Sequence, residues 1–239
     1  MNPDADRLRD YYATRLGSKE IARRSSLSDP AALFSRQRRA RVALSLLTAH
    51  GVTDLSSLRL LEIGCGSGDV AAEYYSHGAR PSNIHGLDIL PNRAAEAAER
   101  VPGGRFVVGD GASLPYRDQG FDIVLQYTAL SSILSPEWRR DVAAEMVRVL
   151  RPGGLILWYD FMWNPLNKQT VGLRKKDLHE LFPNCELEFR RVTLIPPIAR
   201  RLVRISWWLA ETLENVRLFN SHYFAAIRKR GDQESSSPR

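Results

Sequence analysis

Apolar residues along the middle of the chain gather in five short runs, and stretches with a helical pattern separate them. The runs lie at 58–63, 83–88, 105–108, 121–126 and 155–160. Helical patterns cover 70–76, 91–100 and 136–150, and Pro91 stands in a first turn, where proline is favoured. Because strands that alternate with helices form parallel sheets, this pattern predicts an α/β fold with helices on both faces of one sheet.

Further elements are predicted on both sides of this pattern. Residues 4–16 and 30–50 read as two helices that precede the sheet. After the sheet we expect a helix over 174–182, a strand over 185–194, one helix over 198–216, a last strand over 221–229 and a disordered polar tail at 231–239. The chain then divides into an N-terminal helical cap (1–57), a core (58–193), a helical insertion acting as a substrate lid (194–217), the last core strand (218–230) and the tail.

A glycine-rich turn joins the first run to the first helix of the core, in the sequence Glu62-Ile-Gly64-Cys-Gly66-Ser-Gly68. Glycines at such a join permit a tight turn and let a ligand approach the backbone. An ordinary strand-to-helix loop is the alternative for this motif alone. Asp88, however, ends the second run about 20 residues later, where a carboxylate accepts ribose hydroxyls. Asp110 follows the third run, where it can face an adenine amino group.

The spacing of the glycines argues against a phosphate-bearing ligand. A nicotinamide dinucleotide site needs Gly-x-Gly-x-x-Gly, and Asp69 stands where its third glycine belongs. No Lys-Ser/Thr pair follows, so the turn is not a P-loop either. Glu62 adds a carboxylate that would repel a pyrophosphate and attract a cation. S-adenosylmethionine, with a sulfonium, an ammonium and no phosphate, fits these charges.

Five motifs follow one another in the order found in class I S-adenosylmethionine-dependent methyltransferases, and the chain resembles that family in its methyltransferase type 11-like form. They are Leu61–Gly68, Gly86–Asp88, Gly109–Pro115, Phe121–Val124 and Val149–Gly154, within residues 58–161. The resemblance implies a Rossmann-like sheet of seven strands, in which an antiparallel seventh strand lies between the fifth and the sixth. It also implies S-adenosyl-L-methionine as the cofactor.

The resemblance assigns cofactor-binding roles residue by residue. It places Glu62, Gly64, Cys65, Gly66 and Gly68 around the methionine part, Asp88 at the ribose, Ile89, Asp110 and Gly111 at the adenine, and Gln126 with Tyr127 at the methionine side. The chain departs from many ubiquinone-type relatives, which carry a histidine pair after the fourth strand, because it has Ser131-Ser132 there. A base at that place is therefore in doubt.

The candidate catalytic residues come from strand ends. Methyl transfer mainly requires that donor and acceptor are positioned, and a hydroxyl acceptor also needs a base. Ligands of an open parallel sheet lie beyond the carboxyl ends of its strands, where the fifth strand ends and an antiparallel last strand begins. We therefore predict His222 as the general base and Asp160 as the second candidate. The alternative for His222 is a purely structural role at the end of a strand. Tyr11 and Tyr12 either fold over the cofactor or pack.

Composition and charge bear on compartment and partners. The chain has 239 residues, 44% hydrophobic and 26% charged, with no apolar stretch of membrane-spanning length and no secretory-type start, so we expect a cytoplasmic protein. Two cysteines, Cys65 and Cys185, make neither a disulfide framework nor a four-ligand zinc site, and no metal is expected. The net charge of +7 is concentrated in the two ends of the chain. We expect no nucleic-acid partner, and the sequence leaves the oligomeric state open.

The sequence of the insertion is compatible with several kinds of methyl acceptor. Arg200, Arg201 and Arg204 lie beside Trp207 and Trp208. Three interpretations of these arginines are open: they are the solvated face of a lid, they recognise an anionic acceptor, or they bind to anionic lipid. We predict methyl transfer to a small molecule, at a hydroxyl of a glycan or secondary-metabolite precursor. The alternatives are a lipid-soluble, quinone-like substrate met at the membrane surface, and a non-catalytic cofactor-binding protein.

Overall fold

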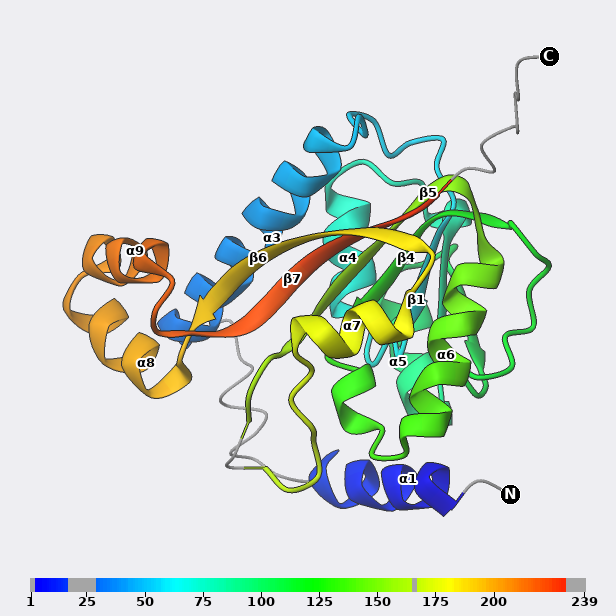
Figure 1. Cartoon of the computed structure of the whole chain (residues 1–239), viewed down its shortest axis with the longest axis horizontal. Helices are drawn as coiled ribbons and strands as arrows, with labels where there is room; N and C mark the ends of the chain where they lie inside the picture. Colours follow the sequence, from blue (N-terminus) through cyan, green and yellow to red (C-terminus); the bar gives the residue numbers. More distant parts are fainter. Residues whose placement is uncertain (1–2, 17–28, 165–166, 231–239) are drawn as a thin grey trace, which may run out of the picture.

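A single seven-stranded sheet forms the centre of the molecule (Figure 1). The computed structural model describes residues 3–16, 29–164 and 167–230. The strands are β1 (Leu60–Ile63), β2 (Ile84–Asp88), β3 (Arg105–Val108), β4 (Phe121–Tyr127), β5 (Leu150–Phe161), β6 (Cys185–Leu194) and β7 (Asn220–Lys229). The helices are α1 (Pro3–Leu16), α3 (Pro30–Ala49), α4 (Asp69–Ser76), α5 (Pro91–Arg100), α6 (Pro136–Val149), α7 (Lys175–Leu181), α8 (Pro196–Ile205) and α9 (Trp207–Val216), with 3-10 turns η1 (Pro81–Asn83) and η2 (Leu130–Ser132).

The strand order is β3-β2-β1-β4-β5-β7-β6. Neighbours from β3 to β5 pair in parallel, whereas β7 runs antiparallel to both β5 and β6. This confirms the predicted Rossmann-like sheet with an antiparallel seventh strand between the fifth and the sixth. The order reverses direction at β1 and β4, and in open α/β sheets ligands bind beyond the carboxyl ends of such strands.

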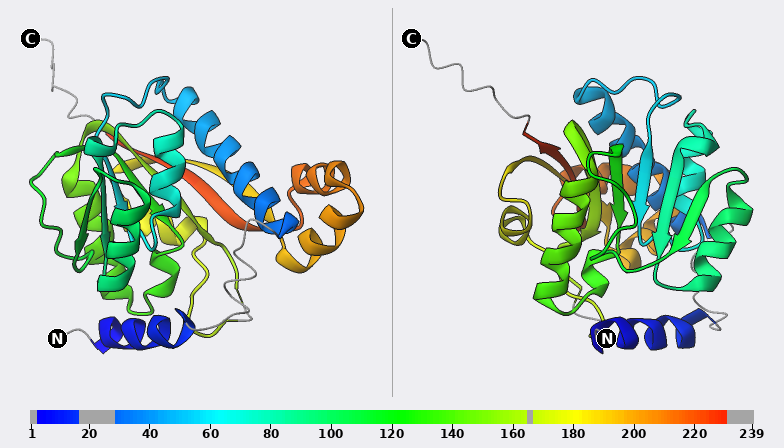
Figure 2. Two further views of the ribbon diagram at one scale, coloured as in Figure 1. Left: turned by 180° about the vertical axis from the view of Figure 1, so that it is seen from behind. Right: turned by 90° about the vertical axis from the view of Figure 1, so that its right-hand side faces the viewer.

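Helices cover both faces of the sheet (Figure 2). Alternate residues of β5 show why, because successive side chains of a strand point to opposite faces. Ile156 and Trp158 pack in the cluster that includes residues of α6 and α7, whereas Leu157 and Tyr159 pack in the cluster that includes residues of α3 and α4. Helix α1 lies across the carboxyl ends of the central strands in all these views.

The insertion between β6 and β7 differs from the single helix that the apolar spacing predicts. It forms two helices, α8 and α9, with an extended residue, Ser206, between them. The Ser206 hydroxyl accepts a hydrogen bond from the Leu209 amide and so caps the start of α9, the role in which serine is favoured over a helix interior. A sharp turn at Ser206 lets both helices pack on Phe34 of α3, through Ala199 and Ala210.

The two helices predicted ahead of the sheet are present as α1 and α3. The predicted disorder of the tail at 231–239 concerns residues outside those described. Among the described helices, none combines the length and the apolar character that crossing a bilayer requires.

Candidate functional site

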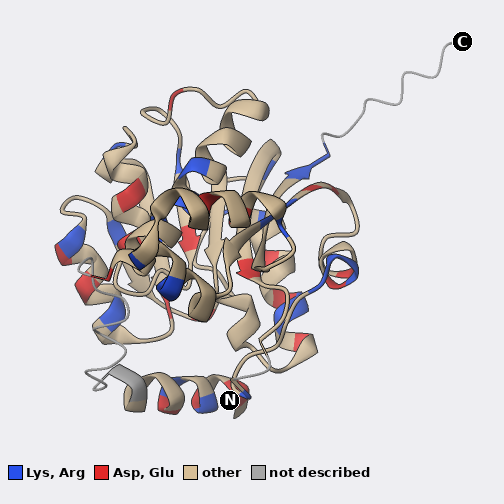
Figure 3. Cartoon of the chain, turned by 90° about the vertical axis from the view of Figure 1, so that its left-hand side faces the viewer, with Lys and Arg blue, Asp and Glu red and all other residues tan. Residues whose placement is uncertain are grey.

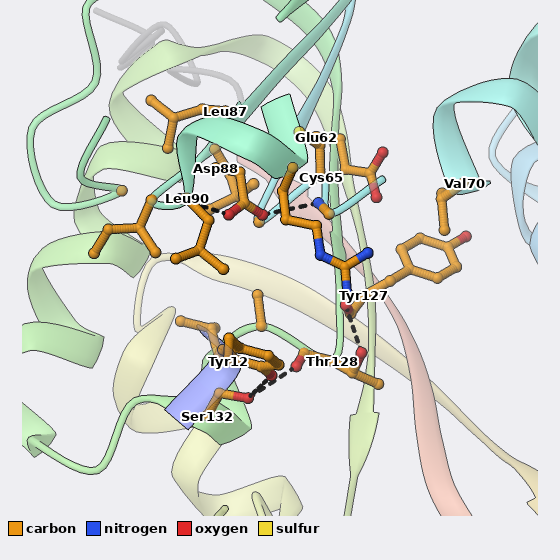
Figure 4. Close-up of a pocket in the computed structure, with 18 of the residues that line it drawn as sticks. Tyr12, Glu62, Cys65, Val70, Leu87, Asp88, Leu90, Tyr127, Thr128 and Ser132 are labelled. Carbon is orange, nitrogen blue, oxygen red and sulfur yellow. Dashed lines mark hydrogen bonds between the residues drawn. The ribbon is translucent and has the colours of Figure 1, made fainter. Parts of the chain in front are cut away.

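A cavity of about 350 Å³ opens beyond the carboxyl ends of β1, β2 and β4, where a ligand site is expected (Figure 4). Its floor is the glycine turn between β1 and α4. The walls come from the loops after β2, β3 and β4 and from the start of α6, and helices α1 and α3 contribute further residues. The lining consists of Leu8, Tyr12, Arg36, Arg39, residues 62–67, Asp69, Val70, residues 87–90, Arg93, Gly109, Gly111, residues 127–130, Ser132, Ile133, Trp138 and Val142.

The glycine turn is pressed against neighbouring segments at two positions. Gly64 has φ +68°, and a Cβ there would lie 2.6 Å from Cβ of Ala129. Gly68 has φ +78°, and a Cβ there would lie 2.8 Å from Cα of Ala97 in α5. Only glycine adopts these angles without strain and leaves the space these neighbours need. Gly64 thus shapes the cavity floor, whereas Gly68, which does not line the cavity, lets α4 approach α5.

Asp88 is anchored at the end of β2 by the backbone. Its Oδ2 accepts a hydrogen bond from the Gly66 amide at 2.8 Å, and its Oδ1 accepts one from the Leu90 amide at 2.9 Å. Burial raises the pKa of the carboxyl, and the two amide donors oppose that rise. Each oxygen of a carboxylate has room for a second hydrogen bond, so Asp88 is held in place and still able to accept from a ligand in the cavity.

Glu62 is the buried acid of the cavity. It is 3% exposed, and among the described residues its Oε2 has no hydrogen-bond partner. Burial raises its pKa well above the usual value, although the charge of Arg39 works in the opposite direction. A buried carboxylate oxygen without a donor is costly, so this atom is suited to a cationic ligand that donates hydrogen bonds.

Arg39 of α3 brings a positive charge to the cavity wall. Its guanidinium lies over the rings of Tyr127 at 5.2 Å and Tyr159 at 5.6 Å, and one Nη donates to Glu73 at 3.0 Å. Its Nε is buried with no hydrogen-bond partner among the described residues. Arg36 lies one turn earlier on the same helix and also lines the cavity. The cavity therefore contains one acidic side chain, Glu62, and one cationic side chain, Arg39, that each have a hydrogen-bonding atom with no partner among the described residues.

Helix α1 is fastened over the cavity. Asp4 accepts hydrogen bonds from the amides of Leu134 and Ser135 at 2.7 and 2.9 Å. Burial alone would raise the pKa of Asp4, but these amides and Arg7 outweigh it and lower the pKa. The Tyr12 hydroxyl hydrogen-bonds to Oγ of Ser132 at 2.9 Å, and Tyr12 lines the cavity. Of the two tyrosines considered from sequence, Tyr12 thus faces the site.

Eight of the eleven residues predicted to bind the cofactor line this cavity, namely Glu62, Gly64, Cys65, Gly66, Asp88, Ile89, Gly111 and Tyr127. Gly68, Asp110 and Gln126 do not. Oδ1 of Asp110 accepts from the Trp138 indole and the Ala112 amide, both within 2.9 Å, so it orients the ring that lines the cavity. Gln126 is fully buried and donates to Asp160 at 3.2 Å.

The two candidate bases, Asp160 and His222, lie outside the cavity lining and on opposite faces of the sheet. Asp160 pairs in register with Tyr223, and Phe161 pairs with His222, so the two side chains point in opposite directions. His222 stacks on the rings of Tyr159 and Phe161, 4.7 and 4.1 Å between centroids. Burial, helped by the charge of Arg39, lowers its pKa to about 3.

Asp160 holds the chain that follows β4. It accepts hydrogen bonds from the amides of Ser131 and Phe161, at 2.9 and 2.8 Å, in addition to the one from Gln126. Burial raises its pKa to about 6. Since η2 contributes Leu130 and Ser132 to the cavity, Asp160 acts on the site through this backbone.

The residues that the sequence prediction missed come mainly from outside the glycine motif. Ser67, Asp69 and Val70 could have been inferred because they continue the same turn into α4. Arg36 and Arg39 could not be placed in the cavity from sequence, because nothing in the local pattern of α3 indicates which face of the helix meets the sheet. Thr128, Ser132 and Ile133 follow β4 and become lining only through the fold of η2.

Comparisons with known proteins point to methyltransferases. A family model described as a methyltransferase domain matches residues 60–154. Phthiotriol/phenolphthiotriol dimycocerosates methyltransferase 1 of Mycobacterium ulcerans is 41% identical over 111 residues, which are 45% of this chain and 39% of that protein. Fatty-acid O-methyltransferase of Mycolicibacterium smegmatis is 41% identical over 110 residues, 45% of this chain and 38% of that protein. The match thus spans less than half the length of these relatives.

Solved structures share the fold over a longer stretch. Magnesium protoporphyrin IX methyltransferase from Synechocystis, solved with bound S-adenosylmethionine, matches with a TM-score of 0.64 at 15% identity, over 96% of this chain and 98% of that one. The cyclase SpnF matches with a TM-score of 0.60 at 20% identity, over 82% of each chain. At such identities the likeness concerns the fold. With the family model and the ordered motifs, it follows that residues 60–154 are a methyltransferase domain of the class I S-adenosylmethionine-dependent type, with S-adenosylmethionine as its cofactor.

Proposed function

We propose that this chain transfers a methyl group from S-adenosylmethionine to a carboxyl oxygen of a small, lipid-type acceptor. The observation that carries the cofactor half is Glu62 Oε2, a buried oxygen in the cavity that finds no donor among the described residues. An ammonium group supplies such a donor together with a compensating charge. A phosphate-bearing nucleotide would place negative charge beside Glu62, Asp69 and Asp88, which is unfavourable.

The lining residues fit the separate parts of this cofactor. We assign the α-ammonium to Glu62 and the α-carboxylate to Arg39, whose Nε has no hydrogen-bond partner among the described residues. Asp88 accepts from the ribose hydroxyls, and Gly64 and Gly66 leave room for the backbone to approach. Ile89 and Gly111 border the adenine, with Trp138 held by Asp110.

The chemistry needs little from the protein beyond position. Bound S-adenosylmethionine supplies a methyl group on a positively charged sulfur, and an acceptor oxygen bonds to the methyl carbon while the carbon–sulfur electron pair returns to sulfur. Tyr12 and Leu8 cover the cavity and exclude water from this step. The hydroxyls of Tyr12 and Ser132, already hydrogen-bonded to each other, can orient the acceptor.

The ionisable residues of the cavity favour one kind of methyl acceptor. Its acids, Glu62, Asp69 and Asp88, all belong to the cofactor end, and the described lining contains no histidine. A carboxyl acceptor is ionised at neutral pH and needs no base, because its pKa lies near 4. Arg36 and Arg39 give the α3 wall a positive charge that attracts such an anion.

The curated relatives favour a lipid-type acceptor over the glycan expected from sequence. The two relatives described above are named for phthiotriol dimycocerosates and for fatty acids. Apolar residues of the lining, including Leu8, Leu90, Leu130 and Ile133, can contact an alkyl chain. We assign Asp160 a positioning role through η2 and His222 a packing role, in place of the general-base roles predicted from sequence.

Calorimetry and a methylation assay test this proposal. We expect S-adenosylmethionine and S-adenosylhomocysteine to bind, and mass spectrometry to show methyl esters when fatty acids of different chain lengths are offered. No heat of binding by folded protein would refute the cofactor assignment. Binding without turnover on fatty acids, with turnover on hydroxylated lipids or glycans, would refute the carboxyl acceptor. Binding without turnover on any of them would favour the non-catalytic alternative.

A further inference from the structure

The α8–α9 insertion carries most of the exposed apolar surface of the described chain. Ten large apolar side chains are exposed in the described residues, and six of them lie between positions 205 and 219. Ile205 and Trp208 are the most exposed, at 74% and 70%. Leu209, Val216, Leu218 and Phe219 complete the set. A soluble protein seldom gathers such residues in one place unless they meet a partner.

Three of these side chains, Trp208, Leu209 and Val216, share one side of α9. The inner side of the helix contains the buried Ala210 and Glu214, and Trp207 stacks edge-on against Phe34 of α3 at 5.1 Å. At 100° per residue, Trp208, Leu209, Thr212 and Val216 fall on the opposite side. The insertion projects from the rest of the molecule in Figures 1 and 2, and its outer side meets no other described element. This outer side, residues 208, 209, 212 and 216, is the α9 outer face; Ile205 ends α8, and Leu218 and Phe219 follow α9.

Unpaired positive charge is present on α8 and directly after α9. The two acids of α9, Glu211 and Glu214, turn toward α3 and pair with Arg38 at 2.7 and 3.2 Å. Arg201, Arg204 and Arg217 are exposed and form no ion pair with a described residue. Figure 3 views this end of the molecule, with the ribbon coloured blue at lysine and arginine and red at aspartate and glutamate. The outer surface of the insertion therefore combines an apolar face with unneutralised arginines and carries no acid.

We propose that the α9 outer face docks on the surface of an anionic membrane. Exposed tryptophan and aliphatic side chains insert at the headgroup boundary, and arginines beside them pair with lipid phosphates. A second copy of the chain is a poorer occupant, because its own arginines would face Arg201, Arg204 and Arg217 across the contact. The proposal is independent of the methyl-transfer assignment, because docking needs no cofactor.

Helix α3 connects this surface to the cavity. Phe34 packs against Trp207, and Arg39, which lines the cavity, follows about 8 Å further along the helix axis. A membrane bound at the α9 outer face lies on the side of α9 that faces away from α3, so the insertion stands between it and this wall of the cavity.

Vesicle sedimentation tests the docking with the full chain. We expect pelleting with vesicles of 70% phosphatidylcholine and 30% phosphatidylglycerol, and about fivefold weaker binding for each of R201Q and R204Q, the effect of about 1 kcal/mol per arginine. W208S should weaken binding at least tenfold. The matched controls are W163S, which removes an exposed tryptophan elsewhere, and R140Q, which removes an exposed arginine of α6. Both should bind like the parent.

Three results would overturn the proposal. The first is no pelleting with anionic vesicles, and the second is an equal loss in W163S or R140Q. The third is a parent that sediments as a dimer in the ultracentrifuge and becomes a monomer in W208S, which would assign the face to a second copy. Since Trp208 is exposed, W208S should keep the circular dichroism and Tm of the parent, which separates a docking defect from misfolding.

Discussion

Replacing Glu62 with glutamine tests the role of its unpaired oxygen. In the ligand-free protein, burial raises the pKa of Glu62 well above 4.5, so the folded chain holds this proton more tightly than the unfolded chain. The free energy of unfolding therefore falls as pH rises from about 4.5 toward the raised pKa. Glutamine is nearly isosteric and uncharged. E62Q should remove this pH dependence and make the ligand-free protein about 1 kcal/mol more stable at pH 7.

The same substitution should weaken cofactor binding. A hydrogen bond to a charged group contributes about 1.5–3 kcal/mol, so losing one should raise the Kd for S-adenosylhomocysteine roughly 10- to 150-fold. At a ligand concentration of about 100 times the parent Kd, the parent gains about 2.7 kcal/mol of stability. A variant that binds about 100-fold more weakly gains only about 0.4 kcal/mol. Calorimetry and thermal unfolding with and without ligand measure both effects.

Two controls separate recognition of the ammonium from general damage. 5′-Methylthioadenosine lacks the amino-acid part of the cofactor, so the parent and E62Q should bind it equally. E99Q changes an exposed glutamate on α5 and should leave binding and stability unchanged. Binding of S-adenosylhomocysteine by E62Q within twofold of the parent would refute the assignment. An equal loss for methylthioadenosine would instead mean that E62Q distorts the whole cavity.

Three further changes have defined outcomes. G68A should lower the free energy of unfolding by about 2 kcal/mol in urea titrations, and by more than G66A, because a Cβ at Gly66 would meet open space. Burial lowers the pKa of His222 to about 3, so the free energy of unfolding decreases as pH falls below about 6.5, where the unfolded chain takes up a proton that the folded chain does not. H222F should make the free energy of unfolding less dependent on pH in this acid range, and an unchanged pH dependence would contradict the burial of His222. Removing Asp4 (D4A) should release α1 and accelerate hydrogen exchange at the Ser135 amide about tenfold, whereas unaltered exchange would mean that α1 is held otherwise.

Local chemistry explains why much of the cofactor end could be predicted from the sequence. Gly64 and Gly68 adopt positive φ angles, which only the residue type itself permits at low cost. Asp88 ends a strand next to β1, and its position follows from the parallel order of the strands. The order of strands and helices likewise follows from the hydrophobic pattern, because the central strands β1, β2, β4 and β5 bury both of their faces.

Side-chain direction across the sheet was not predictable from the sequence. Asp160 and His222 do lie at the same edge, as expected, but their pairing register sends them to opposite faces and away from the cavity. A change of one residue in register reverses every side chain, and no local pattern near β7 fixes that register.

The sequence by itself determined the fold class, the glycine turn and the acids at the ends of β1 and β2, because these depend on backbone preference and on residues close together in the chain. The tertiary structure alone decided that Arg39 and Tyr12 complete the cavity, and that the insertion breaks at Ser206 to leave an apolar face outward. These features arise when helices distant in sequence pack on the sheet, and many alternative packings satisfy the same periodicity. Packing depends on contacts between segments throughout the molecule, whereas backbone preference depends on the residue itself.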